Sequence, residues 1–474
     1  MTGLAGLTTP DAFDELARVL STWVPRQRWF AGKARDFSAL RLHDAALLTA
    51  AEESDLVLEV LVEVDYDDGH TERYQVPLAA GDTDSEGAVG EVGGVHLVDA
   101  AYVPAAARVL TALTSEPAER LTARGDVLFG QPLDDEPVSL DNPRRMSAEQ
   151  SNTSIVLGDA VIYKLFRRLE TGQNPEVEIT RALTQANFSH APRQRGACGV
   201  RHADGSVTAL GVLADFVKGA REGWELATAD VAHCVAGEAD DSDFLDRVGD
   251  LGRAIAQMHI ALAATLGWRE AEPDDLTNWV QAMERQAVNV LTTARRRAAE
   301  ATAPILARWE EIRAAVDRLA DEKATGPLTR IHGDLHLGQV LLDAGDRWQV
   351  LDFEGEPAKS VEERRALNAP LRDVAGMLRS FDYAAASGSG GDLDHVPDSA
   401  AQWRDTARQR FLDAYLDAAA GTDVLPADGA SVTAQLDAFE LDKAIYELGY
   451  ELANRPTWIP IPVGGITRVL DHHA

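Results

Sequence analysis

Basic residues, cysteines and long apolar segments are all scarce in this chain of 474 residues. Its 45 Lys and Arg residues are outnumbered by 77 Asp and Glu residues, and the net charge of −32 would repel nucleic-acid backbones and anionic lipid surfaces. The only cysteines, Cys198 and Cys234, argue against a disulfide framework and a cysteine-based metal site. No run of about 18 apolar residues occurs, and the first residues do not combine a basic segment with an apolar core. These absences predict a cytoplasmic protein that binds neither nucleic acid nor membrane.

The composition that remains is typical of a soluble globular protein. Hydrophobic residues make up 45% of the chain and charged residues 26%. The length predicts about two to four folded units. Short apolar runs separated by turns dominate the first half, whereas helical periodicity dominates the second half. The pattern therefore predicts an α+β fold.

Capping and turn signals predict individual elements. A Thr-Thr-Pro start signal precedes a helix over Asp11–Trp23, and an Asp-Asp-Gly turn joins two strands, Leu56–Tyr66 and Thr71–Leu78. We interpret the acidic, glycine-rich stretch Gly81–Gly94 as a loop and Ala384–Asp392 as a flexible connector. The longest helical patterns cover Phe244–Leu266, Asn278–Ala320, Trp403–Ala419 and Val432–Glu451.

One strand-turn-strand stretch, Thr329–Phe353, interrupts the helical half and concentrates polar residues between apolar runs. Within it, Asp334, Gln339 and Asp352 follow one another in that order. Phosphoryl transfer from ATP needs a carboxylate near the acceptor hydroxyl, an amide oxygen for the metal, and a second carboxylate that holds Mg²⁺ against the phosphates. Protein kinases carry these groups in the same order, with Asn where this chain has Gln339. Because Gln keeps an uncharged oxygen donor, the hairpin predicts phosphoryl transfer with ATP and Mg²⁺ as cofactors.

Two other interpretations of this hairpin are open at this point. His332, Asp334 and His336 could be turn residues that cap a buried hairpin. Their i, i+2, i+4 spacing could instead hold zinc, although the neighbouring glycines do not suit a rigid ligand-bearing helix and no fourth ligand is apparent. The ordered set of base, amide and second carboxylate favours phosphoryl transfer over both.

A kinase of this kind also needs a lysine on a strand of its first lobe, paired with a carboxylate on a helix. The strand pattern Ala160–Arg167 contains Lys164, and the next helix begins with Glu176 and Glu178, either of which could be the partner. An ordinary solvated strand lysine is the alternative interpretation of Lys164.

A run of short polar side chains, Glu149–Ser154, precedes the lysine strand and could present backbone N–H groups to phosphate. The candidate contacts in it are Ser151, Asn152 and Thr153. The run lacks glycine, so it is a weak signal by itself. The chain contains no GxxxxGK[ST] sequence, which excludes a P-loop enzyme.

Together the His332–Gln339 and Val350–Pro357 segments resemble the aminoglycoside-phosphotransferase branch of the protein-kinase-like superfamily, and within it the actinobacterial maltokinases. The resemblance implies a bilobal fold with an N-terminal cap over residues 1–100, an intermediate subdomain over 101–216 that completes the ATP lobe, and a mainly helical C-lobe over 217–474. The supporting stretches are spread along nearly the whole chain: Pro25–Gly32, Glu149–Ser154, Lys164–Arg168, Leu371–Ala384, Glu440–Glu447 and Arg455–Pro462.

The same resemblance implies residue roles. Asp334 would be the catalytic base, Gln339 and Asp352 the magnesium ligands, and Lys164 the phosphate-binding lysine. We include Glu178 among the predicted nucleotide-binding residues, while the choice between Glu176 and Glu178 as the partner of Lys164 stays open. The segment that contacts adenine would be the hinge around Leu213, Phe216 and Val217.

The sugar side would use the last long helix, where Lys443, Tyr446, Glu447 and Tyr450 share one face by their i, i+3, i+4, i+7 spacing. Aromatic faces with neighbouring carboxylates suit a sugar, which offers both C–H patches and hydroxyls. His332 and His336 join this predicted set because they flank the base. The alternative is a half-buried helix whose tyrosines fill the core and whose charges pair with each other.

Three functions follow. The first is a maltokinase that forms maltose 1-phosphate for α-glucan synthesis, and the second is a kinase for glucosamine or an aminoglycoside. Carboxylates on the last long helix would suit such a cationic acceptor: Glu440, Asp442, Glu447 and Glu451. The third is a catalytically silent sugar-binding protein, which the intact set of candidate residues disfavours. We expect a monomer or a weak homo-oligomer.

One departure from the family pattern concerns acceptor specificity. The loop Ala366–Pro370 carries Asn368 where the resemblance leads us to expect a carboxylate, and we expect this loop near the acceptor. His259, on an apolar helix, is interpreted as a satisfied core histidine.

Overall fold

The chain divides into two compact units in the computed structural model. The first contains Met1–Arg181 and Pro192–Lys218, and the second contains Ala182–Ala191 and Gly219–Ala474. The structure describes residues 3–33, 35–49, 56–146, 151–238, 243–320, 325–391, 393 and 395–472. Glu149 and Gln150, at the start of the predicted polar loop, lie outside these residues.

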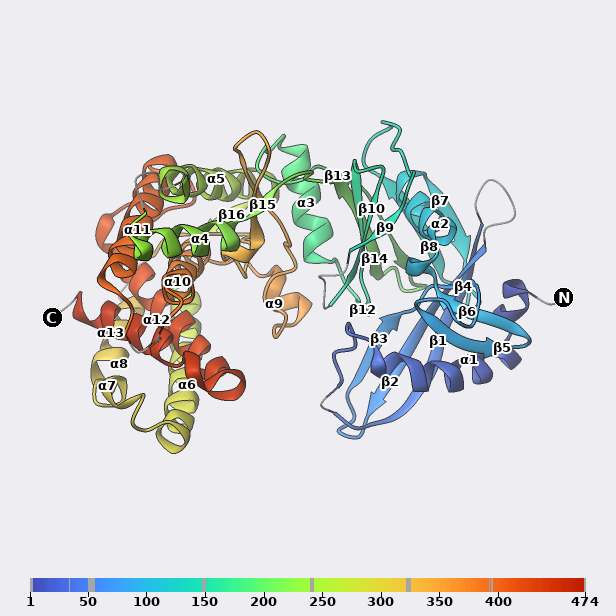
Figure 1. Cartoon of the computed structure of the whole chain (residues 1–474), viewed down its shortest axis with the longest axis horizontal. Coiled ribbons are helices and arrows are strands. Elements are labelled where there is room, and N and C mark those ends of the chain that lie inside the picture. Colours follow the sequence, from blue (N-terminus) through green and yellow to red (C-terminus); the bar gives the residue numbers. More distant parts are fainter. Residues whose placement is uncertain are drawn as a thin grey trace. The chain divides into compact units, whose positions relative to one another are not determined.

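The first unit begins with a seven-stranded antiparallel sheet, and α1 (Pro10–Trp23) packs on it against β1 and β5 (Figure 1). The strands run in the order β12-β3-β2-β4-β6-β5, with β1 also paired to β2. Their bounds are β1 (Phe37–Thr49), β2 (Leu56–Tyr66), β3 (Thr71–Gln75), β4 (Leu78–Ala80), β5 (Ala88–Val92), β6 (Val95–Asp99) and β12 (Arg168–Leu169). The predicted helix and the predicted hairpin are both confirmed. Sequence analysis did not anticipate that β12, which follows the lysine strand, returns to pair with β3.

A second seven-stranded sheet completes this unit, in the order β7-β8-β13-β14-β11-β10-β9. Its strands are β7 (Ala118–Leu121), β8 (Val127–Pro132), β9 (Arg144–Arg145), β10 (Thr153–Leu157), β11 (Val161–Leu165), β13 (Gln194–Arg201) and β14 (Val207–Asp215). Helix α2 (Pro104–Ser115) packs against β8 and β13. Glycines permit this close packing, because a Cβ on Gly130 or Gly196 would lie 1.7 Å or 2.0 Å from a backbone oxygen of α2.

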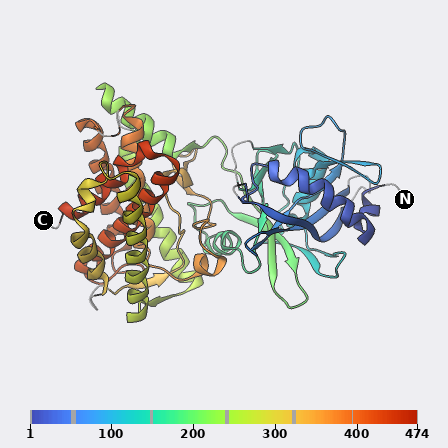
Figure 2. The same ribbon diagram turned by 90° about the horizontal axis from the view of Figure 1, so that it is seen from below.

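The second unit is mainly helical (Figures 1 and 2). Its helices are α4 (Gly223–Ala236), α5 (Asp243–Leu266), α6 (Pro273–Arg297), α7 (Ala303–Leu306), α8 (Trp309–Asp317), α9 (Val361–Arg365), α10 (Leu371–Gly388), α11 (Asp398–Ala419), α12 (Gly429–Asn454) and α13 (Pro460–Asp471). Short sheets interrupt them: β15 (Arg221–Glu222), β18 (Val340–Leu342) and β19 (Trp348–Val350) form one, and β16 (Trp268–Glu270) pairs with β17 (Pro327–Thr329). Helix α3 (Pro175–Gln185) spans the boundary between the two units.

Three sequence predictions differ from the structure. The stretch Gly81–Gly94 is not all loop, because Ala88–Val92 forms β5 and pairs with β6. Ala384–Gly388 is not a flexible connector but the last turn of α10, and Ala384 is fully buried there. The continuous pattern Asn278–Ala320 is broken into α6, α7 and α8. In the first two cases, strand pairing with β6 and burial within α10 outweighed local composition.

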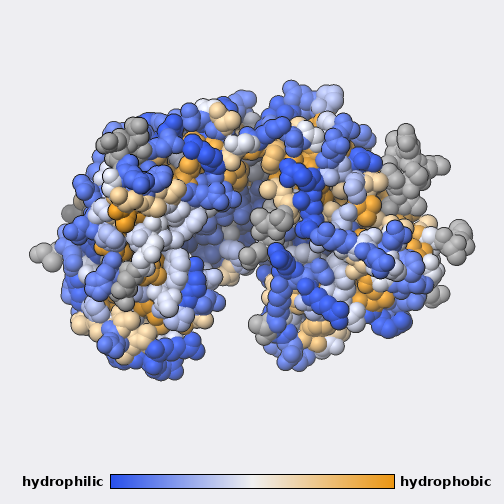
Figure 3. Space-filling view, in the orientation of Figure 1, coloured by the Kyte–Doolittle hydropathy of each residue, from blue (hydrophilic) through white to orange (hydrophobic). Residues whose placement is uncertain are grey.

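Hydrophilic residues cover most of the molecular face seen in Figure 3, as the net charge of −32 leads one to expect. In the part of the chain that the structure describes, no helix is long and apolar enough to cross a lipid bilayer.

Candidate active site

The residues predicted to contact the phosphates lie on the β10–β11 hairpin of the first unit or just before it. Thr153 begins β10, and in the antiparallel register Thr153 faces Leu165 while Ser154 faces Lys164. Asn152 and Thr153 are buried, whereas Ser151 is exposed. Because paired strands lie about 5 Å apart, the register brings Lys164 next to the end of the polar loop.

The carboxylates predicted to pair with Lys164 occupy the first turn of α3. Glu176 is buried and Glu178 is half-buried. Asn174 precedes the helix, and its side chain accepts a hydrogen bond from the backbone N–H of Val177 at 3.2 Å. The pairing of Lys164 with either carboxylate stays a prediction.

The predicted adenine hinge lies at the end of β14, beside the lysine strand. Leu213 is fully buried and faces Tyr163 of β11 in the antiparallel register. Phe216 follows the strand and donates its backbone N–H to the carbonyl oxygen of Ala160 at 2.8 Å. Phe216 and Val217 are half-buried. Their role in nucleotide binding stays a prediction.

Asp334, the predicted base, lies in the second unit and forms an ion pair with Lys443 of α12. The two side chains approach to 3.2 Å, from Lys443 Nζ to Asp334 Oδ1. Burial alone would lower the pKa of Lys443, but the carboxylates of Asp334, Glu447 and Glu356 raise it above its ordinary value. Lys443 therefore stays protonated and holds one oxygen of Asp334.

Gln339 and Asp352, the predicted metal ligands, converge at the ends of β18 and β19. Gln339 Nε2 donates to Asp352 Oδ2 at 3.2 Å, and the backbone N–H of Leu351 donates to the Gln339 carbonyl at 2.9 Å. Asp352 has a φ of 61°, a left-handed conformation that turns its side chain off the strand. Amide and carboxylate oxygens are ligands that Mg²⁺ prefers, so the two residue types suit this ion when the amide oxygen of Gln339, rather than its nitrogen, faces it.

The loop that carries Asp334 is held from behind by a buried carboxylate, Asp373 of α10. The backbone N–H groups of His332 and Gly333 donate to its two oxygens at 2.7 Å and 2.9 Å. His259 contacts Asp373 through Nε2 at 3.0 Å and Tyr415 through Nδ1 at 2.9 Å. Burial would raise the pKa of Asp373, but the His259 hydrogen bond and the neighbouring histidines lower it below its ordinary value. The interpretation of His259 as a satisfied core histidine is confirmed.

The two histidines beside the base make hydrogen bonds with the backbone. His332 is 1% exposed, with Nε2 2.8 Å from the Leu351 carbonyl and Nδ1 accepting from the Asp334 N–H at 3.3 Å. We propose that His332 positions the loop, because both of its ring nitrogens already have partners that a sugar hydroxyl would have to displace. His336 Nδ1 accepts from the Gly338 N–H at 3.0 Å, and burial lowers the pKa of this histidine.

The face of α12 that was predicted to bind the sugar carries side chains that already form ion pairs within the protein. Glu447 accepts two hydrogen bonds from the buried guanidinium of Arg379, at 2.7 Å and 3.0 Å, and burial raises the pKa of Glu447. Tyr450 is 48% exposed. Tyr446 is half-buried, and its ring centre lies 5.3 Å from Lys443 Nζ. Lys443, Tyr446 and Tyr450 therefore stay predictions as sugar contacts, whereas Glu447 already has an arginine partner.

The other carboxylates of α12 that a cationic acceptor could use are also paired with arginine. Glu440 pairs with Arg408 at 2.8 Å, Asp442 with Arg372 at 3.1 Å and Glu451 with Arg455 at 2.7 Å. Asn368, from the loop that departs from the family pattern, forms a backbone bridge with Thr329.

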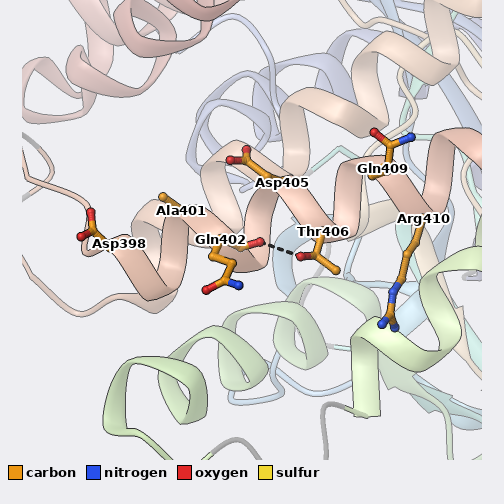
Figure 4. Close-up of a pocket in the computed structure, with 7 residues that line it drawn as sticks. All are labelled: Asp398, Ala401, Gln402, Asp405, Thr406, Gln409 and Arg410. Atoms are coloured by element: carbon orange, nitrogen blue, oxygen red, sulfur yellow. Dashed lines mark hydrogen bonds between the residues drawn. The ribbon is translucent and has the colours of Figure 1, made fainter.

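Within the described residues, no three His, Cys, Asp or Glu side chains form a group that could hold a metal ion. An open hollow on the α11 surface is lined by Asp398, Ala401, Gln402, Asp405, Thr406, Gln409 and Arg410, none of which belongs to the predicted site (Figure 4). The dashed contact there is a helical one, from the Thr406 hydroxyl to the Gln402 carbonyl at 2.8 Å.

Two family models match the chain. The maltokinase N-terminal cap domain matches residues 23–103, and the phosphotransferase enzyme family matches residues 144–427, which is more than half of the chain. The chain belongs to the phosphotransferase enzyme family. It is a phosphotransferase that acts on an alcohol group, with the kinase-like fold of this family and an N-terminal cap.

Curated relatives of the phosphotransferase are named as glucosamine kinases. The one from Mycolicibacterium smegmatis is 30% identical over 329 residues, which cover 69% of this chain and 79% of that protein. The one from Streptacidiphilus jiangxiensis is 30% identical over 334 residues, covering 69% of this chain and 73% of that protein.

Solved structures named as glucosamine kinases are also similar to the phosphotransferase, and the similarity covers more of its chain. A glucosamine kinase in complex with glucosamine, ADP and inorganic phosphate has a TM-score of 0.69 at 26% identity, with 91% of this chain and 94% of that chain covered. Another crystal form has a TM-score of 0.68 at 25% identity and covers 92% of this chain and 93% of that chain. The predicted fold class is confirmed, and the maltokinase resemblance is supported for the cap alone.

Sequence analysis missed Asp373 as part of the phosphotransferase site. Its sequence surroundings are those of an ordinary first-turn helix carboxylate, which favours a helix N-terminus and carries no other signal. Only the fold shows that the side chain is buried and that it accepts from the loop of the base.

Proposed function

We propose that this phosphotransferase transfers the γ-phosphoryl group of ATP to a hydroxyl group of glucosamine. The observation that carries the proposal is the similarity, over most of both chains, to relatives and solved structures named as glucosamine kinases. One of those structures contains glucosamine and ADP, the acceptor and the nucleotide product of this reaction, together with inorganic phosphate.

In the proposed reaction Asp334 accepts the proton of the acceptor hydroxyl. Lys443 holds Oδ1 of Asp334, so that Oδ2 is left to meet the hydroxyl. The hydroxyl oxygen attacks the γ-phosphorus, the bond to the β,γ-bridging oxygen breaks, and ADP leaves. Asp373 fixes the loop behind the base, so the carboxylate does not have to be ordered when the substrate arrives.

The nucleotide is assigned to the first unit. Lys164 contacts the phosphates, with Glu178 as its partner. The backbone and side chains of Ser151, Asn152 and Thr153 cover them. Leu213, Phe216 and Val217 contact the adenine. In the second unit, Gln339 and Asp352 are the residues that would hold Mg²⁺, and the ion would neutralise negative charge on the phosphates.

The acceptor ammonium has few carboxylates to pair with on α12. Glu440, Asp442, Glu447 and Glu451 each already contact an arginine, so an amino sugar that used them would have to break an ion pair. We therefore do not assign the amino group of the acceptor to this row of carboxylates.

Maltose is the second candidate acceptor, and the match of residues 23–103 to the maltokinase cap favours it. Phosphorylation would then occur at the anomeric hydroxyl and give maltose 1-phosphate. The paired state of the α12 carboxylates is compatible with this acceptor, because maltose carries no charge.

An acceptor screen tests both proposals. ADP release is measured with glucosamine, maltose, glucose and kanamycin, and the phosphorylated position is read by ³¹P and ¹H NMR. We expect kcat/KM for glucosamine to exceed that for the other sugars at least tenfold, and Asp334→Asn to be the inactive control. A higher kcat/KM for maltose would select the second candidate. ATP binding by calorimetry without turnover on any sugar would instead support a catalytically silent protein.

A further inference from the structure

Arg167 is a fully buried arginine that joins the two sheets of the first unit. It lies between β11, which carries Lys164, and β12, which pairs with the cap strand β3. Its exposed fraction is 0%, and its guanidinium lies 5.1 Å from the ring centre of Trp29 in the cap. Few arginines are buried so completely, because removing a charge from water is unfavourable unless it is paired.

The guanidinium contacts one partner in each sheet. Nη2 donates to Asp99 Oδ2 at 2.6 Å, and Asp99 is the last residue of cap strand β6. Nε donates to the Thr153 hydroxyl at 2.8 Å, and Thr153 begins β10 at the end of the polar loop. Asp99 is itself 0% exposed, so the pair is shielded from water and ions.

The backbone of Arg167 is fixed by the same cap sheet. The N–H of Gln75 donates to the Arg167 carbonyl at 2.8 Å. The Gln75 side chain donates to the carbonyls of Phe166 and Leu210, at 3.0 Å and 2.8 Å. These hydrogen bonds fix the backbone around Arg167 to the cap sheet. Because the Arg167 side chain donates to Thr153, the cap in turn fixes the position of the Thr153 hydroxyl.

A second contact joins the strand before the loop to the cap side. Arg145 of β9 forms an ion pair with Glu86 at 3.1 Å, and its guanidinium lies 4.2 Å from the ring centre of Tyr102. Glu86 is exposed, so this contact is weaker than the buried pair. It extends the link between the cap side and the hairpin that carries the polar loop.

We propose that Arg167 is a positioning residue through which the cap sets the geometry of the phosphate-contacting residues 151–153. The inference rests on the proposed role of these residues in binding ATP. A threonine hydroxyl has one proton to donate and two lone pairs. Because one lone pair accepts from a cation, the O–H group is polarised and its proton is left to donate to an oxygen of the nucleotide or of the loop.

Four variants test the inference in the full-length chain, with the Kd of Mg²⁺-ATP by calorimetry and the KM values as readouts. Asp99→Asn removes the charge that holds Arg167 from the cap, and Thr153→Val removes the hydroxyl. We expect each to raise the Kd and KM for ATP at least tenfold while KM for the sugar changes less than twofold. Thr153→Ser, which keeps the hydroxyl, should stay within threefold of wild type. Arg167→Lys keeps a charge for Asp99 but loses the second donor, so it should raise KM for ATP even if Asp99→Asn does not fold.

A matched control separates positioning from stability. Asp44 is another buried cap carboxylate, 1% exposed, which accepts from the Ala45 and Arg124 N–H groups at 2.8 Å and 3.1 Å but does not contact Arg167. We expect Asp44→Asn to lower the melting temperature without changing KM for ATP. If Asp99→Asn and Arg167→Lys behave like Asp44→Asn, the inference is wrong while the proposed function stands. A wild-type chain that binds no ATP would contradict both.

Discussion

The ammonium group of Lys443 lies 3.2 Å from the carboxylate of Asp334, although the two residues are 109 positions apart in the chain. The contact with Lys443 gives the carboxylate of Asp334 a fixed orientation. The arrangement favours a reaction in which the carboxylate orients the hydroxyl and takes its proton late, as a loose phosphoryl-transfer transition state requires.

Replacing Asp334 by Asn should lower kcat by about 10²–10⁴-fold, the usual contribution of a positioned general base. We expect the Kd of Mg²⁺-ATP to change less than threefold, because the side chain is close in size and only its charge is removed. Single-turnover kinetics and calorimetry measure the two quantities. Near-normal turnover would show that the base is another residue.

Lys443 can be tested through the same pair. Lys443→Met keeps most of the buried stem and removes the charge, so Asp334 loses the partner that orients it. We expect kcat to fall by about tenfold or more, whereas Lys443→Arg, which keeps the charge, should retain more activity than Lys443→Met. Equal activities of the two variants would contradict a role for the ion pair.

Asp373→Asn should reduce kcat with little change in either KM. An amide has one acceptor oxygen, so it cannot accept from both His332 and Gly333 while it also contacts His259. Weakening a hydrogen bond to a charged group costs about 1.5–3 kcal/mol, so we expect a kcat loss of roughly tenfold to a hundredfold. Tyr415→Phe, at the far end of the chain of contacts, should have a smaller effect. A rise in KM with unchanged kcat would contradict this assignment.

The order of the functional groups could be predicted from the sequence, because Asp334, Gln339 and Asp352 lie within one short hairpin and their spacing carries the chemistry. The residues that hold Asp334 and its loop in place could not be predicted from the sequence. Asp373 and Lys443 reach Asp334 or its loop from helices far away in the chain, and such contacts depend on helix packing. Glu447 is a different case: its helical spacing predicts a sugar contact, which stays a prediction, and only the fold shows that the buried Arg379 donates to it.

Elements of the fold with local sequence signals could likewise be predicted, whereas those that depend on distant contacts could not. Helix α1 and the β2–β3 hairpin were predicted from local signals alone. The β5 strand and the end of α10 were not, because small and flexible residues become regular structure there only through pairing with β6 or burial among other helices.

Glu59 should make the stability of the chain fall as the pH rises. Burial raises the pKa of this carboxyl to about 8 from its ordinary value of 4.5, with Arg167 partly opposing and Asp99 adding to the rise. Below pH 4.5 both states are protonated. Between the two values the unfolded chain loses its proton first, so the free energy of unfolding falls by about 1.4 kcal/mol per pH unit from this group.

Glu59→Gln removes this titration, so its stability relative to wild type should increase between pH 5 and pH 8. Urea denaturation at three pH values measures the difference. Asp82→Asn, at an exposed position between β4 and β5, is the control and should show a constant difference. A constant difference for Glu59→Gln as well would contradict the raised pKa.

Two glycines of α5 should respond oppositely to alanine. A Cβ on Gly252 would lie 2.3 Å from the carbonyl oxygen of Phe411 in α11, so Gly252→Ala has to push the helices apart and should destabilise by about 1–3 kcal/mol. A Cβ on Gly249 would meet Ala414 at 3.7 Å, an ordinary contact. Gly249→Ala should be neutral or should stabilise by up to about 1 kcal/mol through helix propensity. Differential scanning calorimetry measures both, and equal shifts would contradict the packing argument.

The two-residue strand β12 makes the cap an integral part of the enzyme rather than an accessory module. Because Arg168 and Leu169 complete the cap sheet beside Tyr74 and Arg73, the polypeptide enters the cap, leaves it, and comes back after the lysine strand. Removal of residues 1–103 would remove β3, the strand with which β12 pairs. A stable chain without the cap would therefore need a changed sequence at Arg168 and Leu169, which follow the lysine strand β11.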